Sequence, residues 1–206
     1  MVMVPKTEIV LVKNFVDMSE KYGIGILYSN GCFAAFFNDK TKLTEYQGEK
    51  EFVYIRKQPN TLGQQEYVQE THTHKDAPAL LAKKLKIFAA MKTHLKEVCP
   101  DYAHQYNRLE TPLLLAWRKT SHATLFRLAN KVVQLVFKDQ SEIVLLSKSK
   151  QVLYCSKEGR RQNFALEDAM TSADTQLTNR LNYAKEVMQQ VLKADSRVQY
   201  QDNAHN

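Results

Sequence analysis

The chain has 206 residues, of which 44% are hydrophobic and 25% charged, and its 29 basic residues outnumber the 22 acidic ones to give a net charge of +7. This composition excludes a disordered linker, and no apolar run approaches the ~20 residues that a membrane helix needs. We therefore expect a folded, soluble protein whose basic surface favours acidic partners such as phosphopeptides, nucleic acid or anionic lipid.

The first part of the chain has the pattern of short strands joined by tight turns. Ser29-Asn30-Gly31 predicts a hairpin turn, because Asn-Gly tolerates the positive φ angles that such a turn requires. The strand that begins at Ile24 would lead into it, and residues 32–37 would form the returning strand. A second turn is expected at residues 38–40. Further strands are predicted at residues 43–46, 51–56 and 67–72.

The hydrophobic period then changes from that of a strand to that of a helix. Apolar residues recur at helical spacing from Leu80 to Val98, so this segment is expected to be one helix. Asp76 is the expected N-cap, with Pro78 in the first turn, and Pro100 would end the helix.

The second part of the chain repeats this order. A hairpin is predicted over residues 123–137 with its turn at Asn130-Lys131, and strands are predicted at residues 143–146, 152–154 and 163–166. A helix is expected from about Ser172 to Leu192, with Ser172 or Asp174 as its N-cap. The apolar face of this helix is formed by Leu177, Leu181, Ala184, Val187, Met188 and Val191.

A shift of 100 residues superimposes the two parts of the sequence. Asn30 falls on Asn130, Phe37 on Phe137, and Asp39 on Asp139. The agreement of turns, strands and helices in one order predicts a duplicated unit, in which an antiparallel sheet carries one helix. Two units of ~90 residues would each be small, so we expect them to pack together.

Several motifs in this order resemble the tandem polo boxes of polo-like serine/threonine kinases. Residues 15–25 and 33–43 resemble the first box, residues 117–120 and 133–137 the second, and residues 180–184 its final helix. The resemblance covers residues 10–193. A glycine-rich loop, His-Arg-Asp and Asp-Phe-Gly are absent, so this chain is not expected to be an enzyme, although the full-length protein is expected to be a serine/threonine kinase.

The resemblance implies an α+β fold of two tandem polo boxes, each a six-stranded antiparallel sheet with a packed helix, which form a sandwich. In that family a phosphorylated Ser/Thr peptide binds in the cleft between the boxes, docks the kinase on its substrates and relieves restraint on the catalytic domain. The expected division is a linker or cap segment at 1–14, polo box 1 at 15–99, an inter-box linker at 100–112, polo box 2 at 113–194 and a C-terminal tail at 195–206.

The resemblance also assigns candidate peptide-binding residues. Phe15 stands where the family has a Trp that packs on the peptide, and its neighbour Val16 matches. His94-Leu95 fits the His-Leu pattern of the first-box helix, which places Leu95 in the peptide site. Trp117 joins this set as a possible ligand contact, although packing between the boxes is the more favoured interpretation.

The phosphate-binding pair of the family is not preserved. A His-x-Lys pair is expected after an Asp in the second box, but Gln140 replaces the His and Glu142 replaces the Lys. Phosphate recognition depends on cationic donors, so a carboxylate at this position should repel the ligand. Lys21 and Lys119 are the candidate compensating cations. Residues 39–42 of the first box have the charge pattern that the second box lost, but a solvated basic turn is the simpler interpretation.

Other site chemistries are disfavoured. His72 and His74 would point the same way on a strand, but no third ligand is nearby in sequence, so neither a metal site nor a cofactor is expected. No nucleophile motif indicates catalysis. The cysteines at positions 32, 99 and 155 have no CxxC spacing and are interpreted as reduced packing residues of an intracellular protein.

Three functions follow from these observations. The first is a docking and regulatory module that binds protein or peptide partners, phosphorylated or not, with weakened phosphate dependence. The second is a phosphopeptide reader that uses replacement cations. The third is a structural module that acts through homodimer formation or restraint of its own kinase domain.

The resemblance also gives expectations for the cell. It implies roles in mitosis and cytokinesis at centrosomes, basal bodies or other cytoskeletal structures of the cytoplasm, or in the nucleus. No membrane partner is expected. Nucleic acid is favoured by charge alone, which makes it the weakest of these hypotheses.

Overall fold

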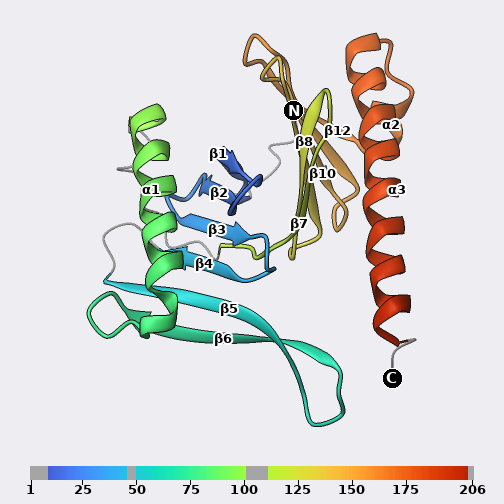
Figure 1. The fold of residues 1–206 in the computed structure, drawn as a ribbon. Coiled ribbons are helices and arrows are strands. Elements are labelled where there is room, and N and C mark those ends of the chain that lie inside the picture. The colour runs from blue at the N-terminus through green and yellow to red at the C-terminus, as the bar shows by residue number, and fades with distance from the viewer. Residues whose placement is uncertain (1–8, 46–49, 101–110, 204–206) are drawn as a thin grey trace. The chain divides into compact units, whose positions relative to one another are not determined.

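The computed structural model describes residues 9–45, 50–100 and 111–203, with side chains as far as residue 191. The chain divides into two compact units, Met1–Thr111 and Pro112–Asn206, which are treated separately below. Each contains a six-stranded antiparallel sheet and a packed helix, as Figure 1 shows. The predicted fold class, with six strands and a helix in each unit, is confirmed.

The first sheet is a meander in which every strand pairs with its neighbours in sequence. Its strands are β1 (Val12–Met18), β2 (Gly23–Tyr28), β3 (Phe33–Phe37), β4 (Lys42–Glu45), β5 (Glu51–Pro59) and β6 (Gln65–Thr73). The predicted hairpin is confirmed, since Gly31 has a φ of +81° and donates a backbone hydrogen bond to Tyr28. The prediction for residues 43–46 extends to Tyr46, which lies outside the described residues.

Strand β1 was not predicted from the residue pattern. Its register with β2 shifts between Val12 and Asn14, where the pairing is irregular. A shift of this kind interrupts the strict alternation that marks a strand in sequence. β1 begins at Val12, which lies inside the segment, residues 1–14, that was assigned to a linker or cap.

Helix α1 (Ala82–Val98) follows a short 3-10 turn, η1 (Ala79–Leu81). The prediction of Asp76 as N-cap was wrong, because no side chain caps either element and Asp76 accepts a hydrogen bond from the hydroxyl of Thr73 instead. Pro78 precedes the 3-10 turn, where its missing N–H costs no helix hydrogen bond. α1 packs against strands β1, β2 and β3.

The core of the first unit lies between α1 and one face of the sheet. α1 contributes Phe88, Met91 and Leu95, all of them buried. Gly25 on β2 permits this approach, because a Cβ at that position would lie 2.8 Å from the Cβ of Met91. The sheet residues of this core are Leu27, Phe33, Ala35, Phe37, Leu43, Phe52 and Tyr54.

The second unit repeats the meander in its own sheet. Its strands are β7 (Leu114–Lys119), β8 (Ala123–Leu128), β9 (Val132–Phe137), β10 (Glu142–Leu146), β11 (Gln151–Cys155) and β12 (Arg161–Ala165). The first strand, β7, was again missed, and it too has an irregular register, between Leu114 and Ala116. A short helix, α2 (Leu166–Met170), follows β12 and was also not predicted.

Helix α3 (Thr175–Asn203) covers one face of the second sheet. Its predicted N-cap is confirmed, since a carboxylate oxygen of Asp174 accepts hydrogen bonds from the backbone N–H groups of Gln176 (2.9 Å) and Leu177 (3.2 Å). Its predicted end at Leu192 was wrong, because the helix continues to Asn203 into the segment that was assigned to the tail. No helix in the described residues has the length and apolarity of a membrane span.

Candidate functional site

The β9–β10 turn, to which the resemblance assigns the phosphate-binding pair, is a tight loop stabilised by its own hydrogen bonds. A carboxylate oxygen of Asp139 accepts hydrogen bonds from the N–H (3.1 Å) and the hydroxyl (2.7 Å) of Ser141. Gln140 has a φ of +68°, and its N–H donates to the carbonyl of Phe137 at 2.9 Å. Arg180 on α3 pairs with the other carboxylate oxygen of Asp139.

A cation–π contact between Arg180 and Phe137 also stabilises the turn. The guanidinium of Arg180 lies 4.4 Å from the ring centroid of Phe137. Burial alone would raise the pKa of Asp139, but the hydrogen bonds from Ser141 and the charge of Arg180 hold that pKa below its ordinary value. Asp139 is therefore ionised at neutral pH, and its carboxylate is occupied by hydrogen bonds within the turn and by the ion pair with Arg180 of α3.

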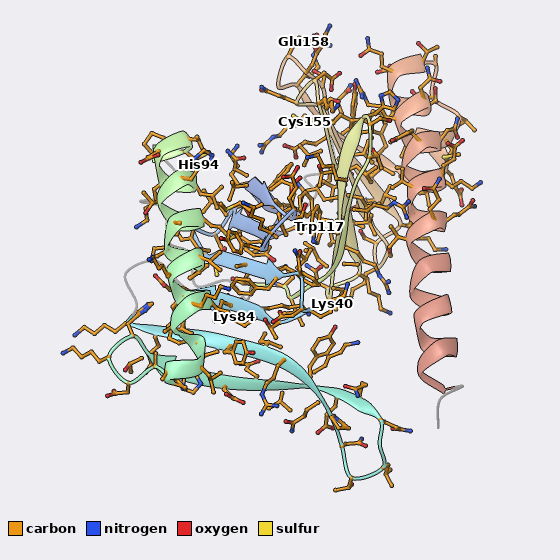
Figure 2. All side chains as sticks on the ribbon, in the orientation of Figure 1. Lys40, Lys84, His94, Trp117, Cys155 and Glu158 are labelled. Atoms are coloured by element: carbon orange, nitrogen blue, oxygen red, sulfur yellow. The ribbon has the colours of Figure 1, made fainter. Side chains whose placement is uncertain are left out.

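The first unit contains the same device at the β3–β4 turn. Asp39 accepts hydrogen bonds from the N–H (3.1 Å) and hydroxyl (2.7 Å) of Thr41, and Lys40 has a φ of +68°. Lys84 on α1 pairs with Asp39 and lies 4.6 Å from the ring centroid of Phe37. Figure 2 labels Lys40 and Lys84. In each unit, an Asp in this turn thus pairs with a basic residue of the helix, so the duplication seen in sequence includes this contact.

Gln140 and Glu142, which the resemblance places at the positions of the phosphate-binding pair, lie close together but differ in exposure. Gln140 is exposed at the tip of the turn, and Glu142 is half-buried at the start of β10. A carboxylate oxygen of Glu142 accepts a hydrogen bond from the amide of Gln134 at 3.3 Å, and Gln134 is itself fully buried. Glu142 therefore has a defined position in the sheet and is not a freely moving surface carboxylate.

Side-chain alternation places Glu142 on the face of the sheet that α3 does not cover. Ile143 and Leu145 pack in the core with α3, so Glu142 and Val144 point to the opposite face. Gln134 lies between two core residues of β9 and shares that opposite face.

Lys119 lies in the same cross-strand row as Glu142 but three strands away. Successive pairs in the sheet link Lys119 to Thr124, Thr124 to Val136, and Val136 to Glu142. Three strand spacings separate the two backbones by about 14 Å. Lys119 is therefore not adjacent to Glu142. Lys21 is exposed in the turn between β1 and β2 of the first unit, and both lysines stay predictions as compensating cations.

The peptide-binding candidates on β1 point to opposite faces of the first sheet. Val16 and Met18 pack against the core with α1, so Phe15, which directly precedes Val16 on the strand, faces away from the helix. Phe15 is half-buried and Val16 belongs to the helix side. Phe15 stays a prediction as a peptide contact, while Val16 has a packing role in its own unit.

The structure corrects the assignment of Leu95. Its side chain is 0% exposed and lies in the core between α1 and the sheet. The neighbouring His94 is exposed on the same helix. A core position was thus interpreted from sequence as a surface position, because the His-Leu pattern does not reveal which of its two side chains faces the sheet.

Trp117 lies on β7, directly opposite Phe126 of β8. Its neighbour Ala116 packs on the α3 core, so Trp117 faces the other side of the sheet, where Phe126 is fully buried. Trp117 is half-buried. This placement on the same face as Glu142 leaves both interpretations, packing and ligand contact, as predictions.

His72 and His74, the candidate metal ligands, contact an aromatic ring and carboxylates. His72 and His74 both lie against the ring of Phe52, with centroid distances of 5.7 and 5.3 Å. A ring nitrogen of His74 lies 3.0 Å from the buried carboxylate of Glu45, and one of His72 lies 3.3 Å from Glu70. Within the described residues, no group of three or more His, Cys, Asp or Glu side chains is placed to hold a metal ion.

Lys42 is a feature that sequence reasoning treated only as part of a solvated turn. Its side chain is 3% exposed, and its ammonium has no hydrogen-bond partner among the described residues. The ammonium lies 4.2 Å from the ring centroid of Tyr67 and 5.1 Å from that of Phe36. Burial, and then the charge of Lys57, lower the pKa of Lys42 to about 8.

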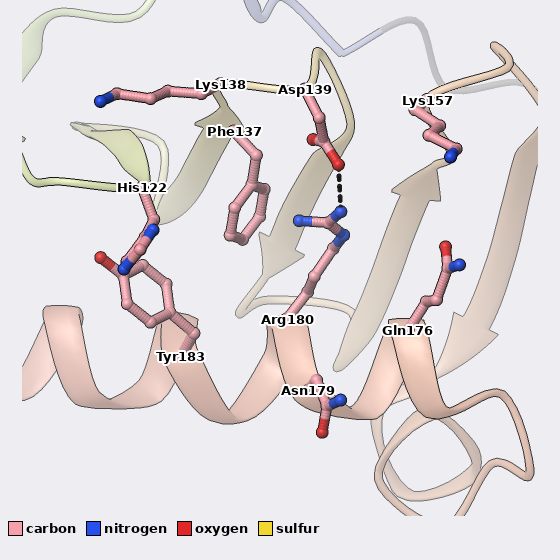
Figure 3. Close-up of a pocket in the computed structure, with 9 residues that line it drawn as sticks. All are labelled: His122, Phe137, Lys138, Asp139, Lys157, Gln176, Asn179, Arg180 and Tyr183. Carbon is pink, nitrogen blue, oxygen red and sulfur yellow. Dashed lines mark hydrogen bonds and ion pairs between the residues drawn. The ribbon is translucent and has the colours of Figure 1, made fainter.

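A pocket of about 550 Å³ opens on the α3 side of the second unit (Figure 3). We call it the α3 pocket. Its lining contains four basic residues, three amide or carboxylate residues and two aromatic residues: His122, Lys138, Lys157 and Arg180; Asp139, Gln176 and Asn179; Phe137 and Tyr183. The pocket is formed by three loops and the first turns of α3, which are far apart in sequence and did not suggest a common site.

Comparison with known proteins gives a consistent result. A family model described as the POLO box duplicated region matches residues 20–85 and 120–181. The probable serine/threonine-protein kinase CCRP1 of Zea mays is 38% identical over 155 residues, which are 72% of this chain and 24% of the relative. The serine/threonine-protein kinase PLK1 of Xenopus tropicalis is 25% identical over 198 residues, 91% of this chain and 31% of the relative.

The chain thus spans about a quarter to a third of the length of these curated relatives. Among solved structures, the budding yeast Cdc5 polo-box domain in complex with an Spc72 phosphopeptide aligns with a TM-score of 0.71 at 18% identity. That alignment covers 89% of this chain and 72% of the other. At this identity, the structural likeness establishes the fold.

Proposed function

The chain belongs to the polo-box family, which its two matched repeats establish, and from this premise we propose that it is a docking module that binds peptide segments of partner proteins and thereby localises a polo-like serine/threonine kinase. As a polo-box region it is itself non-catalytic. The observation that carries the proposal is the match in both duplicated halves. A structural neighbour in complex with a phosphopeptide supports peptides as the class of partner.

We also propose that phosphate contributes little to binding at the inherited position. Glu142 stands where the family pattern has a lysine, and the buried amide of Gln134 fixes its carboxylate. A phosphoryl group carries about −1.5 to −2 charges at neutral pH, so this carboxylate opposes its approach. The neutral amide of Gln140 can donate only a weaker hydrogen bond than a cation would.

The first test is calorimetry with a matched pair of peptides, Ser-pThr and Ser-Thr, in a sequence context that polo boxes bind. We expect both to bind the 206-residue chain with affinities within about threefold of each other. A preference of tenfold or more for the phosphorylated peptide would contradict weakened phosphate dependence. It would favour the alternative with replacement cations, which Lys119→Glu and Lys21→Glu would then test. Binding of neither peptide would contradict the docking proposal.

Restoring the family pair should restore phosphate selectivity. In Gln140→His with Glu142→Lys, the local charge changes by two units at position 142, and histidine is tolerated at the positive φ of position 140. We expect affinity for Ser-pThr to rise at least tenfold, with little change for Ser-Thr. The control Gln140→His with Glu142→Gln removes the repulsion but adds no lysine, and should give an intermediate gain. Equal affinities of wild type and both variants would show that these positions do not face the phosphate.

A further inference from the structure

The α3 pocket is separate from the inherited phosphate position, although both adjoin the β9–β10 turn. The pocket is lined by Phe137, Arg180 and Tyr183, which belong to the helix side of the second sheet. Glu142 and Gln134 lie on the opposite face of that sheet. A short peptide whose phosphate is placed at Gln140 and Glu142 would therefore not also place it in the pocket.

The charge of the pocket lining matches that of a phosphoryl group. Lys138, Lys157 and Arg180 bring three positive charges and Asp139 brings one negative charge, which leaves +2 with His122 set aside. Glu158 lies outside the lining but pairs with Lys157 at 3.8 Å, with both side chains exposed. Among the described residues that line the pocket, Asp139 alone carries a carboxylate. A phosphoryl group at neutral pH carries about −1.5 to −2 charges, so the lining has a net charge of the opposite sign and similar size.

The single carboxylate of the pocket is already engaged and does not oppose an anion strongly. One of its oxygens accepts two hydrogen bonds from Ser141, and the other pairs with Arg180. Arg180 itself is fixed by this pair and by its stacking over Phe137. A positioned guanidinium loses little conformational freedom when it binds a second anion, which favours binding.

Neutral donors complete the lining. In Figure 3 the side chains of Lys157 and Gln176 point toward each other across the space beside Arg180. Asn179 and His122 also line the pocket. The rings of His122 and Tyr183 meet edge to face, with their centroids 5.7 Å apart. The first backbone N–H groups of α3 are taken by Asp174, so side chains rather than the helix terminus would bind the anion.

We propose that the α3 pocket is an anion site, separate from the inherited peptide site, which binds the phosphate group of a phosphorylated serine or threonine in a partner protein. The choice of a protein ligand rests on the proposed docking function. The pocket's volume of about 550 Å³ suits a single phosphorylated side chain, within the range of about 300 to 1,000 Å³ found for small-ligand sites. A partner whose phosphorylated residue enters this pocket while another segment occupies the inherited peptide site would gain affinity through simultaneous binding.

The test uses O-phospho-L-serine as a probe, titrated into the ¹⁵N-labelled 206-residue chain and followed by amide chemical shifts. We expect saturable shifts centred on His122, Lys138, Lys157 and the first turn of α3. Lys138→Glu with Lys157→Glu should weaken binding at least tenfold. Both lysines are exposed, so the fold should persist, and the dispersion of the spectrum checks this directly.

Lys131→Glu with Lys148→Glu is the matched control, since it changes the net charge equally. Both control lysines are exposed in turns at the other end of β9 and β10. The control should bind the probe within twofold of wild type. Equal losses in both double variants, shifts centred on Gln140 and Glu142, or the absence of saturable shifts would each overturn the proposal. Because the probe is not a peptide, this result is independent of whether the chain docks the matched peptides.

Discussion

Replacement of Lys42 by methionine is expected to raise the free energy of unfolding at pH 7 by about 2 kcal/mol. Lys42 is 3% exposed, and its ammonium has no hydrogen-bond partner among the described residues and is repelled by Lys57. The gap between its ordinary pKa of 10.5 and its folded pKa of about 8 corresponds to about 3 kcal/mol. Contacts with the Phe36 and Tyr67 rings return about 1 kcal/mol of this.

The same group predicts a pH dependence. Because the folded pKa of Lys42 lies below the unfolded value, the unfolded chain binds more protons between about pH 8 and 10.5. The penalty is therefore fully present below pH 8 and is relieved as the pH rises through this window. We expect the stability advantage of Lys42→Met to be largest at pH 7 and to disappear near pH 10.5.

Urea unfolding of wild type and variant at pH 7, 8, 9 and 10 measures this difference directly. Groups that titrate equally in both proteins cancel in the comparison. Lys57→Met is the comparison variant. It removes an exposed cation over the same Tyr67 ring and the weaker of the two causes of the Lys42 penalty, so any gain in stability should stay well below that of Lys42→Met. A variant that is less stable than wild type at pH 7 would show that Lys42 is stabilising in its charged form.

Leu95→Ala is expected to destabilise the chain by about 3 kcal/mol without abolishing peptide binding. Leu95 is fully buried between α1 and the first sheet, and removal of a buried leucine side chain typically costs about 2 to 5 kcal/mol, because the cavity fills only partly. The residue supports the position of the helix and does not present its side chain to a ligand.

His94→Ala is the matched control for this prediction, one position away on the same helix and exposed. It should leave stability within about 0.5 kcal/mol of wild type. Peptide affinity of both variants is measured at a temperature where each is fully folded, and we expect values within threefold of wild type. A tenfold loss of affinity in Leu95→Ala with unchanged stability would restore Leu95 as a direct peptide contact.

The residue pattern predicted the elements that have strong local signals. The Asn-Gly hairpin in the first unit, the turn at Asn130 and the Asp174 cap depend on backbone conformations and hydrogen bonds within a few residues, so the sequence specifies them directly. The first strand of each sheet was missed for a local reason as well. Irregular registers near Val12 and Leu114 interrupt the alternation by which strands are recognised.

By itself, the sequence determined the duplicated unit and its sheet-and-helix composition, and its resemblance to the family predicts that positions 140 and 142 lack the cationic pair. Only the tertiary structure decided which side chains share a face. It buried Leu95, separated Lys119 from Glu142 by three strands and enclosed Lys42 between aromatic rings. It also brought Lys138, Lys157 and Arg180 into one pocket. The physical reason is that burial and charge proximity depend on pairing between distant segments, which spacing along the chain does not encode.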